Sequence, residues 1–252
     1  MIARFFALTL LLTLSLGWGW VYPSVQREEG GVPFGPGERL RFQVTWLGIP
    51  AGEAEFQVVS QTVWKGKPVY HLVATVRSSQ FLSLFYKIRD RLESYWDRTY
   101  LIPWYFSLRQ REGRYRSYRE VIFDHAQSQA LYQKNRRPPR AIPVPNGVQD
   151  SLSSLYYLRT LPLQVGQRLT IPLWVGSGVK SVEVRVLRRE ALETRWGEIE
   201  AFVVQPLITE GEGIFRDKRD LLIWLSSDRR KLPLKVSMRI AIGHIEGTLV
   251  ER

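Results

Sequence analysis

The feature that most constrains the fold of this chain is a repeated alternation of apolar and polar residues. Leu40, Phe42 and Val44 alternate with Arg39, Arg41 and Gln43. Successive side chains of a strand point to opposite faces, so this period of two predicts a strand with one buried face. The pattern recurs at residues 54–58, 70–76, 104–108, 169–175, 182–186, 221–225 and 234–240. About a dozen strands joined by short turns would form a sheet so large that it must curl or split.

The fold class that follows is all-β and mainly antiparallel, a large strongly curved sheet or unclosed barrel with one or two short helices. All-β domains of this length often form one unit, and a hydrophobic content of 44% is enough for a core. The expected division is a signal peptide or uncleaved anchor at 1–19, a flexible N-terminal segment at 20–34 and one β domain at 35–252. The proline-rich stretch 135–146 predicts a surface loop or a linker, and one sheet shared by both halves is preferred over two domains.

Two segments depart from the strand pattern. Residues 79–88 place apolar side chains at helical spacing and almost all round the helix, which therefore needs to be covered by core or by ligand. Asp150 is a good N-cap for a second helix over 150–159, which would stop near Pro162. The candidate ligand-binding residues on the two helices are Phe81, Leu82, Leu84, Phe85, Tyr86, Tyr156, Tyr157 and Arg159. The alternative is that both helices simply complete the core.

The N-terminus has the pattern of a targeting segment. Arg4 precedes an apolar run at residues 5–16, which is short for a membrane span, and Gly17-Trp18-Gly19 is a small-x-small pattern suited to cleavage. An uncleaved anchor with interfacial aromatic residues is the alternative. The chain contains no cysteine, so it has no lipoprotein anchor and no disulfide. We therefore expect export to the periplasm or cell envelope.

The charge balance favours anionic partners. The net charge is +12, and removal of residues 1–19 takes away only the charge of Arg4. Two basic tracts supply the candidate anion-contact residues Arg111, Arg114, Arg116, Arg136, Arg137 and Arg140. Lipid headgroups or an acidic envelope component are the expected partners, and export argues against nucleic acid. The alternative is that these arginines are solvated hairpin ends.

No recognisable catalytic centre or metal motif is found in the sequence. His71, His125 and His244 do not lie at the spacing of metal ligands, and no phosphate-binding loop or dinucleotide fingerprint occurs. Asp90, Glu93 and Asp97 form the best carboxylate cluster, with arginines interleaved. Ion pairing explains that cluster at least as well as acid–base catalysis. We expect no cofactor, no metal and no enzymatic activity.

Several segments together resemble one bacterial family. They are residues 37–42 (GERLRF), 48–54 (GIPAGEA), Arg89-Asp90 through Glu93-Ser94 to Asp97, 121–124 (VIFD), 150–159 (DSLSSLYYLR) and 224–233 (WLSSDRRKLP). In their order they resemble domain-of-unknown-function family 3108, whose members are mostly exported and uncharacterised. The resemblance implies no catalytic residues, because the family has none assigned.

Three functions are consistent with these features. The leading hypothesis is an exported envelope protein that binds a lipid or another apolar or anionic ligand in its curved sheet, with the two helices as lid or plug. Its rival is a scaffold or assembly factor that recognises an envelope protein through a sheet edge or the basic loops. An enzyme acting on envelope polymers is third.

Overall fold

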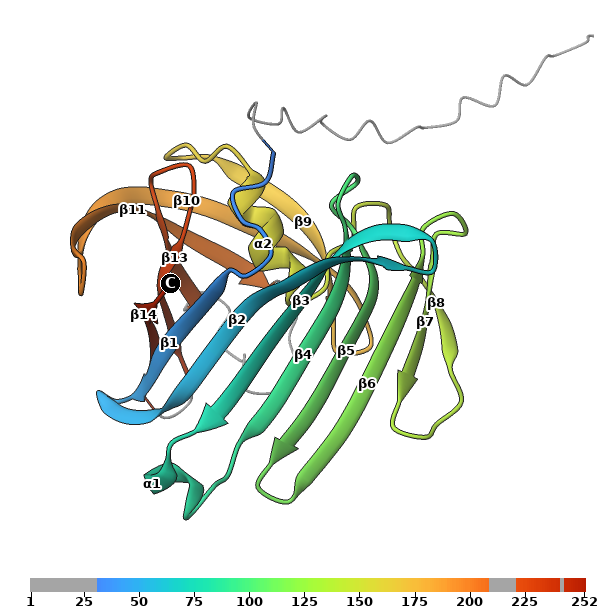
Figure 1. Cartoon of the computed structure of the whole chain (residues 1–252), viewed down its shortest axis with the longest axis horizontal. Coiled ribbons are helices and arrows are strands. Elements are labelled where there is room, and N and C mark those ends of the chain that lie inside the picture. The colour runs from blue at the N-terminus through green and yellow to red at the C-terminus, as the bar shows by residue number, and fades with distance from the viewer. Residues whose placement is uncertain (1–30, 209–220, 241–242) are drawn as a thin grey trace, which may run out of the picture.

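The computed structural model describes residues 31–208, 221–240 and 243–252. The described residues form one antiparallel sheet of 14 strands and two short helices (Figure 1). The first eight strands are β1 (Arg39–Trp46), β2 (Ile49–Trp64), β3 (Lys67–Ser78), β4 (Arg89–Asp97), β5 (Pro103–Glu112), β6 (Tyr115–Asp124), β7 (Gln129–Lys134) and β8 (Arg140–Pro143). The other six are β9 (Arg168–Val175), β10 (Gly178–Thr194), β11 (Gly197–Ile208), β12 (Leu221–Ser226), β13 (Pro233–Arg239) and β14 (His244–Glu251). The helices are α1 (Gln80–Ser83) and α2 (Ser153–Thr160).

The sheet continues from the first half of the chain into the second because β1 pairs with β14. Phe42 lies opposite Leu249 and Val44 opposite Gly247 in that ladder. The strand order runs from β8 down to β1 and then from β14 down to β9, so β8 and β9 are the two edges of an unclosed, strongly curved sheet. The predicted fold class is thus confirmed.

The prediction of a loop over 135–146 is wrong in part, because β8 lies within it. This short strand pairs with β7, and Ala141 lies opposite Leu131. Pro138 and Pro139 stay in the turn, while Pro143 ends the strand at the sheet edge. A proline is tolerated there because no ladder hydrogen bond requires its missing N–H.

Side chains and one short backbone bridge close much of the gap between the two edges. Gln149 N donates to Pro172 O and Gln149 O accepts from Trp174 N, each at 2.8 Å, on the edge strand β9. The Trp174 ring packs against Phe123 and Tyr132 from the opposite edge region. The curved sheet is therefore held nearly shut without a complete strand ladder.

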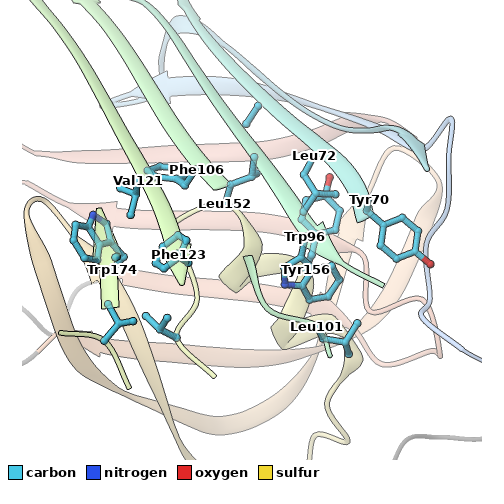
Figure 2. Packing of buried hydrophobic residues seen from close by; sticks show 14 of the residues in the cluster. Tyr70, Leu72, Trp96, Leu101, Phe106, Val121, Phe123, Leu152, Tyr156 and Trp174 are labelled. Atoms are coloured by element: carbon cyan, nitrogen blue, oxygen red, sulfur yellow. The ribbon is translucent and has the colours of Figure 1, made fainter. Parts of the chain in front are cut away.

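The core consists of three clusters. The first joins β2–β7 to α2 around Leu72, Trp96, Phe106, Phe123 and Tyr156 (Figure 2). The second packs α2 and the residues after it against β9–β12, and the third joins β1 to β11–β14. Of the predicted flexible segment 20–34, residues 31–34 are described, and Phe34 lies 5.0 Å from the Tyr156 ring centre within the first cluster. The signal-peptide prediction falls on residues outside the described ones.

Helix α2 occupies the concave side of the sheet. Asp150 caps it, because its Oδ1 accepts hydrogen bonds from Leu152 N and Ser153 N at 2.7 and 2.8 Å. The helix itself begins at Ser153, later than the predicted start at Asp150, because Ser151 and Leu152 form a turn that precedes it. Leu161 is extended, as expected of the residue before Pro162, and this ends the helix.

Helix α1 is a single turn at the sheet end. Ser79 caps it, with Leu82 N donating to Ser79 Oγ at 3.2 Å. The helix predicted over 79–88 stops at Ser83, and the chain then returns to β4. The core does not cover it, since Phe81, Leu84 and Phe85 are 63%, 79% and 77% exposed. Neither helix, nor any other helix in the described ranges, has the length and apolarity needed to cross a membrane.

Candidate functional site

A groove of about 1110 Å³ runs beside β1. It extends from Arg195, in the turn between β10 and β11, to Phe81 on α1. Its lining residues are Arg41, Gln43, Ile49, Pro50, Gly52, Glu53, Arg77, Ser78, Ser79, Gln80, Phe81, Arg195 and Val250. Because side chains alternate along β1, Arg41 and Gln43 lie on the side away from the buried Leu40 and Phe42. The groove is therefore separate from the core.

The groove combines apolar walls with arginines. Ile49, Phe81 and Val250 supply apolar surface, and Arg41, Arg77 and Arg195 supply positive charge against one lining carboxylate, Glu53. Such a wall suits a ligand with an apolar body and an anionic group.

The three arginines of the groove differ in their hydrogen-bond and ion-pair partners. Arg41 pairs with Glu251, yet its Nε is buried and finds no hydrogen-bond partner within the described ranges. Arg195 is fixed by donation from Nη1 to Val250 O. Arg77 is exposed, and no described carboxylate lies within ion-pair distance of it. The Arg77 side chain is therefore left for an anion, whereas the unpaired Nε of Arg41 is buried.

The predicted residues of the first helix gather at the α1 end of this groove. The loop from Ser79 to Ile88 is fastened on both sides: Ser79 N donates to Ala51 O at 2.8 Å, and Gly113 N donates to Lys87 O at 2.9 Å. Ser78 Oγ also accepts from Ile88 N at 2.9 Å. Of the predicted residues, Phe81 lines the groove, Leu82 is half-buried, and Leu84, Phe85 and Tyr86 lie exposed beside it.

The predicted residues of the second helix lie elsewhere, inside the core. Tyr156 is fully buried, and Tyr157 is half-buried between two core clusters. Arg159 forms a bidentate ion pair with Glu38, with Nη1–Oε1 and Nη2–Oε2 distances of 2.7 and 2.8 Å. Its guanidinium also lies over the ring of Phe34. The two helices therefore do not form one site, and a ligand could contact Tyr156 only by displacing core.

All six predicted anion-contact arginines lie at the same end of the sheet as α1. Arg111, Arg114 and Arg116 belong to the β5–β6 hairpin, and Arg136, Arg137 and Arg140 to the β7–β8 hairpin. Each is exposed and has no carboxylate partner in the part of the chain that the structure describes. Arg116 instead donates to the carbonyl oxygens of Gly113 and Tyr115.

The three carboxylates considered for acid–base catalysis, Asp90, Glu93 and Asp97, have separate surroundings. Glu93 bonds His71, with a distance of 2.6 Å between Oε1 and Nε2. Asp97 is buried at the end of β4, where it accepts from Thr99 N and Trp104 Nε1.

Asp90 lies near the α1 loop and accepts from Arg111 N at 2.8 Å. Partial burial raises its pKa to about 6, and hydrogen bonding to Glu112 acts in the same direction. Within the described residues, no group of three or more His, Asp or Glu side chains could hold a metal ion.

The residues of the groove that sequence reasoning missed are Arg41, Arg77 and Arg195. The alternation of β1 and β3 places Arg41 and Arg77 on a solvent face, but nothing in the local pattern distinguishes them from other outward arginines. Arg195 reaches β14 only because the long β10–β11 hairpin lies against it, and a contact across 55 residues of chain leaves no local signal.

Comparisons with known proteins identify the fold and the family. The structure is similar to the crystal structure of a beta-barrel-like protein of domain of unknown function DUF1849 from Brucella abortus, with a TM-score of 0.53 and 10% sequence identity. The match covers 84% of this chain and 95% of that one, and at such low identity it concerns the fold alone. No curated protein matches the sequence. The model of the family described as protein of unknown function (DUF3108) matches residues 41–250, and the chain therefore belongs to that family.

Proposed function

We propose that this protein is an exported, non-catalytic envelope protein that binds a lipid or a similar anionic amphiphile in the groove beside β1. The observation that carries the proposal is the joining of apolar walls to arginines along one groove. The apolar N-terminal run with its cleavage-like pattern supports export.

The size and chemistry of the groove support this class of ligand. Small-molecule sites commonly measure about 300–1000 Å³, and this groove, at about 1110 Å³, is slightly larger than that range. An acyl chain would contact Ile49 and Phe81, while a phosphate or carboxylate would accept from Arg41 and Arg77. Arginine is suited to this role because its planar guanidinium binds such groups with two parallel hydrogen bonds.

The proposed location differs from the concave face that the sequence first suggested. Helix α2 packs there against two core clusters, and its Tyr156 and Leu158 are buried. Binding on the side of β1 away from the core leaves that packing intact. The curved sheet therefore acts as a rigid support for the groove.

The experiment is native mass spectrometry of the whole chain purified from its own envelope fraction, followed by lipid extraction. We expect a heterogeneous added mass that resolves into lipids. Arg77→Glu should reduce the occupied fraction several-fold, because it replaces an attractive charge in the groove by a repulsive one. The matched control is Lys65→Glu, since Lys65 is exposed in the β2–β3 turn at the opposite end of the sheet and does not line the groove.

Two outcomes would contradict the proposal. A bare polypeptide mass for the folded parent chain would exclude a stably bound amphiphile. Equal occupancy in Arg77→Glu and the parent would place the ligand elsewhere. A single stoichiometric polypeptide in place of lipid would instead favour the scaffold hypothesis.

A further inference from the structure

The end of the sheet that carries α1 is unusually apolar for a solvent-facing surface. We define the α1 rim as Leu47, Ile49, Phe81, Leu84, Phe85 and Tyr86, each of which is an exposed large hydrophobic residue. Leu84 and Phe85 expose more than three quarters of their surface. Scattered single apolar residues need no explanation, whereas a contiguous group of them does.

These residues are contiguous because neighbouring turns hold one another. Ser79 bonds the backbone of Pro50 and Ala51, which joins the α1 loop to the β1–β2 turn. On the other side the Tyr86 ring covers Gly113, where a Cβ atom would lie 2.7 Å from the ring. The Phe81 and Phe85 rings contact each other edge to face at 5.8 Å. These hydrogen bonds and ring contacts therefore fix the conformation of the rim.

Positive charge lies along the same end of the sheet. The connections β1–β2, β3–β4, β5–β6 and β7–β8 all leave the sheet at this end, because the strands are antiparallel and adjacent in chain order (Figure 1). The β5–β6 and β7–β8 turns carry the six exposed arginines from Arg111 to Arg140, none with a carboxylate partner among the described residues. An apolar tip is thus flanked by unneutralised cations.

We propose that the α1 rim docks on an anionic lipid membrane surface. Phe81, Leu84 and Phe85 enter the boundary between headgroups and acyl chains, and the arginines of the two hairpins contact the anionic headgroups. Apolar insertion combined with basic residues is the general chemistry of interfacial membrane binding. A second copy of this chain fits the rim poorly, because it would present the same cations and repel.

Docking in this orientation would also bring the groove to the membrane. Ile49 and Phe81 belong both to the rim and to the groove lining, so one end of the groove opens at the docking surface. An amphiphile could then pass between bilayer and groove without crossing water. The docking itself rests on the rim alone, so it can fail or hold independently of the proposed ligand.

The first test uses the absence of cysteine in the chain. Phe85→Cys and, as a control, Val63→Cys each provide one labelling site for an environment-sensitive fluorophore. Val63 is comparably exposed, at 68%, but lies beside the β2–β3 turn at the opposite end of the sheet. With vesicles of phosphatidylcholine and phosphatidylglycerol we expect a blue shift and brighter emission at position 85 and no change at position 63. Pure phosphatidylcholine vesicles should give a much weaker response.

This design separates rim docking from attachment by the N-terminal segment. Attachment through residues 1–19 would bring the whole chain to the vesicle without burying the label at position 85 in lipid. Equal responses at positions 85 and 63, or no response at 85 with anionic vesicles, would overturn the proposal. So would a response that grows with protein concentration without vesicles, because it would show self-association through the rim.

The second test measures vesicle partitioning by flotation of the whole chain. The triple variant Phe81→Ser, Leu84→Ser and Phe85→Ser should weaken partitioning by about tenfold or more, because it removes the inserted apolar surface. Arg114→Gln with Arg136→Gln should weaken binding to anionic vesicles by several-fold and reduce its salt dependence. The control Val63→Ser with Tyr100→Ser removes two exposed apolar residues outside the rim and should change nothing. Unchanged partitioning of the triple variant would overturn the proposal.

Discussion

The two helices of this protein both carry leucine and aromatic residues, but they have opposite structural roles. Helix α2 is buried between two core clusters and carries Tyr156, one of the largest fully buried side chains in the described chain. Helix α1 has no buried residue: Phe81 is exposed and Leu82 is half-buried. The apolar content of a short helix therefore does not determine whether it belongs to the core.

The difference arises from the connection in which each helix lies. Helix α2 belongs to the long connection between the two edge strands β8 and β9, so it can fold back over the concave side. Helix α1 lies between neighbouring strands whose pairing continues up to Arg77 and Arg89. Ser78 N donates to Ile88 O at 3.1 Å, which closes that connection and holds α1 at the sheet end.

The largest expected contrast in stability is between Tyr156 and Phe85. Tyr156→Ala should lower the free energy of unfolding by about 3–5 kcal/mol, because it leaves a cavity in the first core cluster. Phe85→Ala should change it by no more than about 0.5 kcal/mol, since the ring is exposed. Urea unfolding of the whole chain, followed by tryptophan fluorescence, measures both values.

A milder change at the same position sharpens this contrast. The Tyr156 hydroxyl is buried and has no hydrogen-bond partner within the described ranges. Tyr156→Phe should therefore be neutral or slightly stabilising, because it removes an unsatisfied polar group and keeps the ring. A large loss in Tyr156→Phe, or equal losses in Tyr156→Ala and Phe85→Ala, would contradict the assignment of α2 to the core.

The next contrast is between a buried and an exposed arginine. Arg159→Ala should cost about 3 kcal/mol, because it leaves the half-buried Glu38 carboxylate without its partner. Removing Glu38 as well should recover part of that loss. Arg114→Ala should stay within about 0.5 kcal/mol, as expected for an exposed surface residue. If Arg159→Ala lowers the free energy of unfolding no more than Arg114→Ala does, the ion pair does not stabilise the fold.

The smallest expected effect is a pH dependence that originates at the α2 cap. Complete burial raises the pKa of Asp150 to about 6 from a usual value of 3.8, although hydrogen bonds from Ser153 N and Ser94 oppose the shift. Between these two pH values the folded state holds more protons than the unfolded state, so stability falls as pH rises through this window. The contribution is on the order of 2–3 kcal/mol for a shift of this size.

Asp150→Asn should remove this part of the pH dependence, since an amide oxygen can still accept from the two backbone N–H groups. The measurement is the free energy of unfolding of parent and variant at pH 4.5 and pH 7.5. From pH 4.5 to pH 7.5, the free energy of unfolding of the parent should fall relative to that of the variant. Asp90 on β4, whose pKa is raised in the same direction, is present in both proteins, so its contribution cancels when parent and variant are compared. If the difference in unfolding free energy between parent and variant is the same at pH 4.5 and pH 7.5, Asp150 does not titrate in this window.

The sequence predicted only a small part of the candidate site, together with residues of the neighbouring α1 rim. Phe81, Leu84 and Phe85 were predictable as an apolar helical turn, but the sequence left open whether core or ligand covers it, and their exposure came only from the structure. The six hairpin arginines were predictable as exposed, because they flank turn signals. The groove was not predictable, since Arg41 lies on β1, Arg77 on β3 and Arg195 in the distant β10–β11 turn.

The sequence by itself determined the class of fold, through its period-two alternation, and the family, through segments that follow one another in a set order. Those properties depend on local spacing, which is preserved in the chain whatever its tertiary arrangement. Only the tertiary structure decided that α2 fills the concave side, that α1 stays outside it and that β10–β11 reaches β14. These arrangements depend on strand register and on which strands become neighbours in the sheet. They rest on contacts between residues that are far apart in the sequence.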